Sequence, residues 1–144
     1  MPGLIQPLPG HNYMLSVMRI VVALVYLQHG LQKLIGFPPT RTAPPDAFTL
    51  LWFAGMIETI GGTLLVLGLL TRPAAFIVAG ELAYIYFFVH LPRAPWPAVN
   101  GGSLAIAYCL PFLYVFFAGP GPWSLDNLIF NRSRSATEPA PATG

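Results

Sequence analysis

Five ionisable side chains lie inside long apolar runs of this sequence, where a charged group is costly unless it is paired or hydrated. They are Arg19, His29 and Lys33 in the first run, Glu58 in the second and Glu81 in the third. In apolar surroundings such groups can bind the polar head of a lipophilic molecule or move protons. They can also serve as ion pairs that fix the packing of helices. Both alternatives predict that these side chains meet in the interior of a helix bundle.

The polar residues of the first run form a stripe. Arg19, Tyr26, His29 and Lys33 follow one another at intervals of seven, three and four residues, which places them on one face of a helix. A polar stripe on a membrane-spanning helix faces other helices or water rather than lipid. His29 lies within the stripe and is predicted as a catalytic residue. Lys33 is predicted to bind substrate or, alternatively, to extend its amine to the membrane surface.

The two glutamates are predicted to lie at similar depths in the membrane. With a rise of about 1.5 Å per residue, Glu58 lies near the midplane, and Arg19 and Glu81 lie on its inner side. Glu58 is predicted as the second catalytic residue. Arg19 and Glu81 are predicted to form a structural ion pair that clips two helices together.

An aromatic face accompanies Glu81 on the third run. Glu81 and Tyr84 share a face of the expected helix, and a carboxylate beside an aromatic ring could hold a flat ring such as a quinone. Both residues are therefore predicted to bind substrate, with ordinary helix packing as the alternative. His90 ends the same run and is predicted to lie at the membrane surface. A haem between His29 and His90 is a further alternative, but the sequence has no HxxxH or HExxH motif, and no metal site is predicted.

The composition predicts the environment of the chain. Hydrophobic residues make up 55% of the 144 residues and charged residues only 8%, against roughly 25% in a soluble domain. So few charges cannot cover a soluble surface, whereas lipid requires none. The net charge of +2 and the lack of a basic tract exclude a nucleic-acid-binding class. Cys109, the only cysteine, lies in an apolar run and is predicted to be a buried, unreactive thiol.

Four apolar runs are separated by breaks rich in proline, glycine or charge. Each run is about 17 to 24 residues long, which at 1.5 Å per residue matches a hydrocarbon core of about 30 Å. Helix is the available form, because unpaired backbone is prohibitive in lipid. The sequence therefore predicts an all-α integral membrane four-helix bundle, in a single domain over residues 1–131, followed by a disordered tail over residues 132–144. The predicted helices span residues 13–36, 48–70, 74–91 and 102–118.

The distribution of lysine and arginine sets the predicted orientation. Four spans put both termini on one side of the membrane. Basic residues on that side outnumber those on the other by four to three, which favours cytoplasmic termini. The terminal side carries Arg19, Arg72, Arg132 and Arg134, and the opposite side carries Lys33, Arg41 and Arg93.

The ionisable residues are embedded in a series of short motifs that resembles the DoxX family of small four-helix membrane proteins of bacteria and archaea. The resemblance covers residues 15–128. Where many members carry a glutamate after the NGG motif, this sequence has Ser103. The motifs are, in order, HGLQK (29–33), ETIGG (58–62), LGLLTRPAA (67–75), GEL (80–82), HLPR (90–93), NGG (100–102) and GPGPWSLD (119–126).

The resemblance implies a place in quinone-linked oxidation at the bacterial cytoplasmic (inner) membrane, as a small subunit or anchor of an oxidoreductase system. It implies no intrinsic cofactor, a quinone as the bound molecule, and membrane lipid with a redox partner protein or a second copy of the chain as partners. His29 or Glu58 would then bond or protonate the quinone oxygens, and Lys33 and Arg72 would orient an anionic substrate. Two alternatives stay open, a carrier or binding protein for a small lipophilic molecule and a structural membrane scaffold without activity of its own.

Overall fold

The computed structural model describes residues 10–129, and within this range it consists of helices and loops without a strand. This confirms the predicted all-α fold, while the predicted tail at residues 132–144 lies outside the described range. A further short helix occupies residues 125–129. The named elements are α1 (His11–Ile35), α2 (Leu50–Leu67), α3 (Thr71–Tyr84), the π-helix η2 (Ile85–His90), α4 (Pro97–Asn100) and α5 (Ser103–Ala118).

Three of the helices are long and apolar enough to cross a membrane. They are α1, α2 and the continuous helix formed by α3 and η2, with 25, 18 and 20 residues and mean hydropathies of 1.6, 1.8 and 1.4. The fourth apolar helix, α5, has 16 residues and is about 24 Å long at 1.5 Å per residue. The apolar runs thus form the helices of an integral membrane protein, as the sequence predicted.

The third helix begins three residues earlier than predicted, at Thr71 rather than at residue 74. Pro73 lies in its first turn, where a missing N–H group costs no helical hydrogen bond. The first N–H groups of the helix find an acceptor far along the chain. Both oxygens of Asp126 accept hydrogen bonds there, from the backbone nitrogens of Leu70 and Thr71, each at 2.8 Å. This cap ties the chain beyond α5 to the start of α3.

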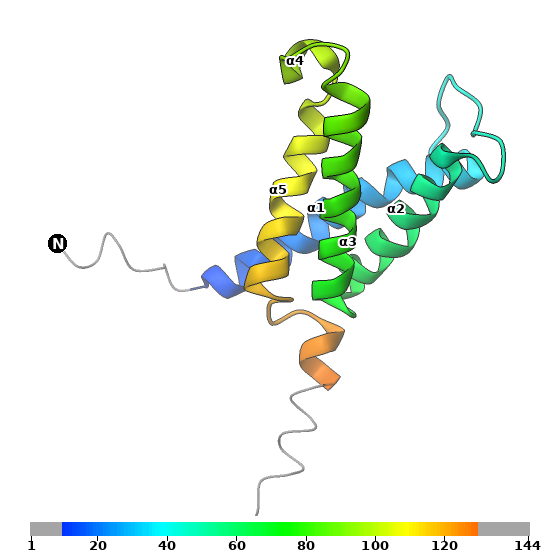
Figure 1. The fold of residues 1–144 in the computed structure, drawn as a ribbon. Helices are drawn as coiled ribbons and strands as arrows, with labels where there is room; N and C mark the ends of the chain where they lie inside the picture. Colours follow the sequence, from blue (N-terminus) through cyan, green and yellow to red (C-terminus); the bar gives the residue numbers. More distant parts are fainter. Residues whose placement is uncertain (1–9, 130–144) are drawn as a thin grey trace, which may run out of the picture.

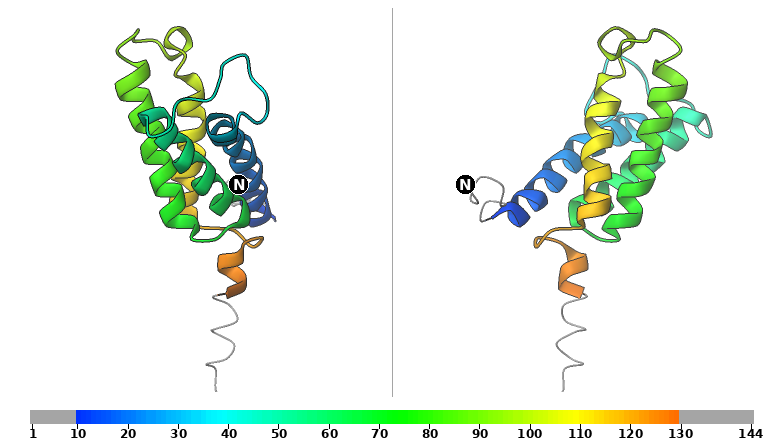
Figure 2. Two further views of the ribbon diagram at one scale, coloured as in Figure 1. Left: turned by 90° about the vertical axis from the view of Figure 1, so that its right-hand side faces the viewer. Right: turned by 60° about the vertical axis from the view of Figure 1, so that its left-hand side comes forward.

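The helices pack as two pairs that cross at an oblique angle. One pair is α1 with α2 and the other is α3 with α5, and the views in Figures 1 and 2 show the second pair side by side and the first pair running across it. At one end, here called the closed end, the turn at residues 68–70 meets the segment at residues 119–124. At the other, here called the open end, the pairs are capped by the loops at residues 36–49 and 91–102.

Glycines set the distance between α1 and α2. A Cβ atom added to Gly30 would lie 2.6 Å from the backbone nitrogen of Thr59, and one added to Gly55 would lie 2.8 Å from the Cβ atom of Lys33. Both distances are too short for atoms that are not bonded. Because lipid gives no hydrophobic drive between helices, membrane helices associate through such close backbone packing. The two helices of the first pair are therefore in close backbone contact.

Arg19 locks the closed end. Its side chain is fully buried, with 0% exposed, and among residues 10–129 its guanidinium donates only to backbone carbonyl oxygens. Nε donates to Pro120 at 2.9 Å and Nη1 to Val66 at 3.0 Å, and further bonds reach the carbonyls of Leu65 and Trp123. Leu65 and Val66 lie in the last turn of α2, where carbonyls have no helical partner and the helix dipole is negative. One side chain thus joins α1, the end of α2 and the segment after α5.

We expect Arg19→Lys to lower the free energy of unfolding by about 2–4 kcal/mol, because a single ammonium group cannot replace a planar fork that reaches four carbonyls. The measurement is reversible unfolding of the purified protein in mixed micelles with increasing sodium dodecyl sulfate. Arg41→Lys in the exposed loop at residues 36–49 is the matched control and should change stability by less than about 0.5 kcal/mol. Equal stabilities for the two variants would show that the carbonyl contacts of Arg19 are dispensable.

Candidate functional site

A cavity of about 430 Å³ lies between the two helix pairs toward the open end. Its walls come from α1, α2, η2, α5 and the loop at residues 40–45, so segments far apart in the sequence share it. This volume falls within the range of about 300–1,000 Å³ typical of small-molecule sites. The polar side chains that line it are Tyr26, His29, Gln32, Lys33, Thr40, Thr42, Glu58, His90 and Tyr108.

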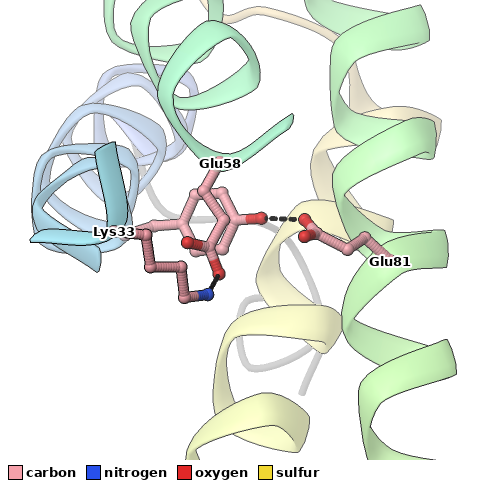
Figure 3. A network of polar contacts seen from close by, with 4 residues as sticks. Lys33, Glu58 and Glu81 are labelled. Atoms are coloured by element: carbon pink, nitrogen blue, oxygen red, sulfur yellow. Dashed lines mark hydrogen bonds and ion pairs between the residues drawn. The ribbon is translucent and has the colours of Figure 1, made fainter. Parts of the chain in front are cut away.

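A salt bridge between α1 and α2 forms the charged part of the cavity wall. The Lys33 Nζ atom lies 2.5 Å from the Oε1 atom of Glu58, and the two side chains are 22% and 4% exposed. Figure 3 shows the lysine reaching across to the carboxylate. Gly55 makes this contact feasible, because any larger residue there would push the Lys33 backbone away. The amine of Lys33 therefore pairs within the bundle instead of extending to the membrane surface.

Two buried polar atoms of cavity-lining residues have no hydrogen-bond partner within the described part of the chain. They are Oε2 of Glu58 and Nε2 of His29. A buried polar atom without a partner is costly, so such atoms in a cavity indicate a place where a bound molecule completes the hydrogen bonding. The His29 ring itself is held by an edge contact with Tyr108 of α5, with the ring centroids 5.8 Å apart.

Glu81 lies next to the cavity but does not line it. The hydroxyl of Tyr26 donates a hydrogen bond to its Oε2 atom at 2.5 Å, and its Oε1 atom has no partner among residues 10–129. Tyr26 is 1% exposed and contributes to the cavity wall. In Figure 3 the Lys33–Glu58 pair lies on one side of the tyrosine hydroxyl and Glu81 lies on the other. Tyr26 therefore links the cavity to a second buried carboxyl group.

The predicted ion pair between Arg19 and Glu81 is wrong. Arg19 donates to backbone carbonyls at the closed end, whereas Glu81 accepts from Tyr26. The ion pair was predicted because the two residues lie at similar depths and a buried arginine was expected to need a carboxylate. Carbonyl oxygens at the end of a helix can accept the hydrogen bonds of an arginine equally well.

Two predicted substrate-binding residues lie away from the cavity. Arg72 is in the first turn of α3 at the closed end, beside Asp126, and it precedes Glu81 by nine residues, or about 14 Å along the helix. Tyr84 is 48% exposed on the outside of the bundle, where it stacks on Phe88 with the ring centroids 4.8 Å apart. The structure thus brings His29, Lys33 and Glu58 into one site, with Glu81 adjacent, and leaves Arg72 and Tyr84 outside it.

His90 is a site residue that the sequence reasoning placed at the membrane surface. The last turn of the third helix is π-helical, with the N–H of Leu91 bonded to the carbonyl of Tyr86 five residues earlier at 2.9 Å. Such wide turns in helices are frequent at functional sites. His90 closes this segment and lines the cavity opposite Glu58.

Some of the missed residues carried a signal and others did not. Gln32 belongs to the HGLQK motif and His90 to the HLPR motif, so the same resemblance that singled out His29 and Lys33 could have included them. Tyr108 lies in an apolar run without any motif, and only the packing of α5 against the His29 ring reveals it.

No three histidine, cysteine, aspartate or glutamate side chains gather closely enough to hold a metal ion among residues 10–129. His29 and His90 both line the cavity, on opposite helix pairs. What the site offers chemically is a charged pair, two imidazoles and two phenols, among apolar side chains.

Comparisons with known proteins give the chain its family. The DoxX family model matches residues 14–91, which include His29, Lys33, Glu58, Glu81 and His90. An uncharacterised protein of Haemophilus influenzae is 45% identical over 125 residues, covering 83% of this chain and 93% of that protein. An uncharacterised membrane protein of Mycobacterium tuberculosis is 27% identical over 132 residues, 80% of each chain. No solved structure matches. With more than half of its length matched by the family model and a relative this similar over most of both chains, the protein belongs to the DoxX family.

Proposed function

We propose that this DoxX protein binds a quinone at the cavity of the open end, as the small subunit or anchor of a quinone-linked oxidoreductase system in the bacterial cytoplasmic membrane. The observation that carries the proposal is the pair of buried, unpartnered atoms, Oε2 of Glu58 and Nε2 of His29, in a cavity between membrane helices. Both atoms can exchange hydrogen bonds with the oxygens of a ring that is otherwise apolar.

The surroundings of the cavity favour a lipophilic ligand with a small polar head. The outer surfaces of the helices are apolar, so a ligand dissolved in the membrane can approach from the side, while a strongly polar molecule would first have to leave water. The charged pair and the imidazoles line the cavity between the two helix pairs. An amphipathic ring with a hydrophobic tail matches both regions.

Each site residue has a role in this proposal. Glu58 and His29 bond the ring oxygens and exchange protons with them as the quinone changes its redox state. Lys33 holds the Glu58 carboxylate in place through its 2.5 Å salt bridge. Tyr26 connects the cavity to Glu81, which provides a second carboxyl group for protons. A partner protein, bound to this chain or to a homo-oligomer of it in the lipid, supplies the electrons.

The orientation is part of the same proposal. The closed end carries Arg72, and the open end carries Lys33, Arg41 and Arg93. The count of basic residues in the sequence, four for the side of the termini against three for the other, favours cytoplasmic termini. The cavity then opens toward the outer surface of the membrane.

A carrier or binding protein for another small lipophilic molecule is the second candidate, because the same cavity would serve it. Binding of a quinone without electron transfer in the presence of the native membrane fraction would favour this candidate. A structural scaffold would bind no such ligand.

We expect Glu58→Gln to weaken the binding of a short-chain benzoquinone, in its tighter-binding redox form, by at least about 10-fold, because the buried carboxylate is a charged acceptor. His29→Phe keeps the ring contact with Tyr108 and removes both nitrogens, and should weaken binding about 3- to 10-fold. The measurement is titration calorimetry of each purified variant in lipid nanodiscs.

Arg72→Gln and Tyr84→Phe are the matched controls, since both residues lie outside the cavity, and they should bind as the unsubstituted protein does. Wild-type affinity in both Glu58→Gln and His29→Phe would contradict the proposed site. No binding of either redox form by the unsubstituted protein would remove the quinone from the proposal and favour the scaffold.

A further inference from the structure

The cavity wall formed by η2 carries an imidazole that the proposed function does not use. His90 faces the cavity from the helix pair opposite Glu58. Its Nδ1 atom lies 2.9 Å from the backbone carbonyl oxygen of Asn100. A carbonyl oxygen can only accept, so Nδ1 must be the donor in this hydrogen bond. In the neutral ring the other nitrogen, Nε2, then carries the lone pair and is an acceptor.

Asn100, whose carbonyl oxygen selects this tautomer of His90, is held in place by hydrogen bonds of its own side chain. Asn100 is 5% exposed, and its side-chain amide donates to the carbonyl of Ala94 at 2.8 Å while its side-chain oxygen accepts from the N–H of Gly102 at 2.7 Å. Both ends of the amide are thus used to hold the connection between η2 and α5. These bonds hold Asn100 in the position in which its carbonyl oxygen meets Nδ1 of His90.

The opposite wall also presents an acceptor. Glu58 pairs with the Lys33 amine through Oε1, and its second oxygen, Oε2, is free to accept a hydrogen bond. Glu58 and His90 therefore offer two acceptors from the two helix pairs. The Lys33 amine belongs to α1, in the same helix pair as Glu58. A ligand that reaches His90 must bring a hydrogen of its own.

We propose that the cavity selects the reduced, dihydroxy form of the ring, a quinol, over the oxidised quinone, with a ligand hydroxyl donating to Nε2 of His90. This rests on the proposed function and narrows it to one redox form. A quinone carbonyl facing the His90 nitrogen places two acceptors against each other, which leaves both without a hydrogen bond at the cost of desolvation. The hydroxyls of a quinol satisfy His90 and Glu58 together.

The first test compares three probes that share one ring and one isoprenoid tail, a short-chain benzoquinone, its quinol kept reduced under argon, and the dimethyl ether of that quinol. We expect the purified protein in nanodiscs to bind the quinol about 10-fold more tightly than the ether, which has the same oxygens without the hydrogens. His90→Phe should weaken quinol binding about 3- to 10-fold and change quinone binding less than 2-fold.

His11→Phe is the matched control, because His11 begins α1 and does not line the cavity, and it should leave the affinities for all three probes unchanged. Equal affinity for quinol and quinone, or an equal loss of both in His90→Phe, overturns the selection while leaving the proposed quinone site intact. If none of the three probes binds, the proposed quinone site itself is contradicted.

The second test reads the tautomer without any ligand. Nitrogen chemical shifts of isotope-labelled histidine in the purified protein, assigned by comparison with His90→Phe, should show His90 protonated at Nδ1 and unprotonated at Nε2 at neutral pH. A ring protonated at Nε2, whether as the other tautomer or as the imidazolium, would make this atom a donor and overturn the proposal.

Discussion

Hydrocarbon offers no hydrogen bonds, so every polar group that enters the membrane must find its partner inside the protein. The fold depends on how the closed end meets this constraint. Arg19, with 0% of its side chain exposed, satisfies its donors on carbonyls that the end of α2 and the segment after α5 leave free. The Asp126 cap does the reverse and supplies acceptors for the first N–H groups of α3. Arg19 and Asp126 both form hydrogen bonds with backbone groups, and these bonds hold the helix pairs together at the closed end.

Toward the open end some buried polar atoms of the described residues have no hydrogen-bond partner, and these atoms are free to bind a ligand. Lys33 and Glu58 satisfy each other through one oxygen, and Tyr26 satisfies one oxygen of Glu81. The other oxygen of each glutamate and Nε2 of His29 have no partner within the part of the chain that the structure describes. The buried hydroxyls of Thr59 and Thr71 also have no partner among residues 10–129, but neither residue lines the cavity. The atoms of His29 and Glu58 differ from them because both residues line one cavity.

The sequence was sufficient for the helices and for half of the site. Apolar length and the cost of bare backbone in lipid predicted the membrane helices, and the spacing of His29 and Lys33 placed both on the correct face. Partner choice could not be predicted, because Arg19 binds carbonyls that composition does not distinguish from any others. His90 was assigned to the membrane surface because it ends an apolar run, and its place in the sequence gave no sign that a π-helical segment brings it to the cavity wall. Arg72 and Tyr84 were grouped with the site by motif order and face-sharing, which ignore distance along and around the bundle.

The glycine contacts of the first helix pair restrict how related chains can diverge. At Gly30 and Gly55 no side chain can be added without separating α1 from α2, and separation would part Lys33 from Glu58. The cavity wall formed by α1 and α2, which carries Lys33 and Glu58, therefore does not tolerate larger residues at these two glycines. The wall across from it meets the cavity with aliphatic side chains such as Ile85 and Leu104, which can grow or shrink one methyl group at a time. Evolution can thus reshape what fits in the cavity from one side, while the chemistry on the other side is inherited unaltered.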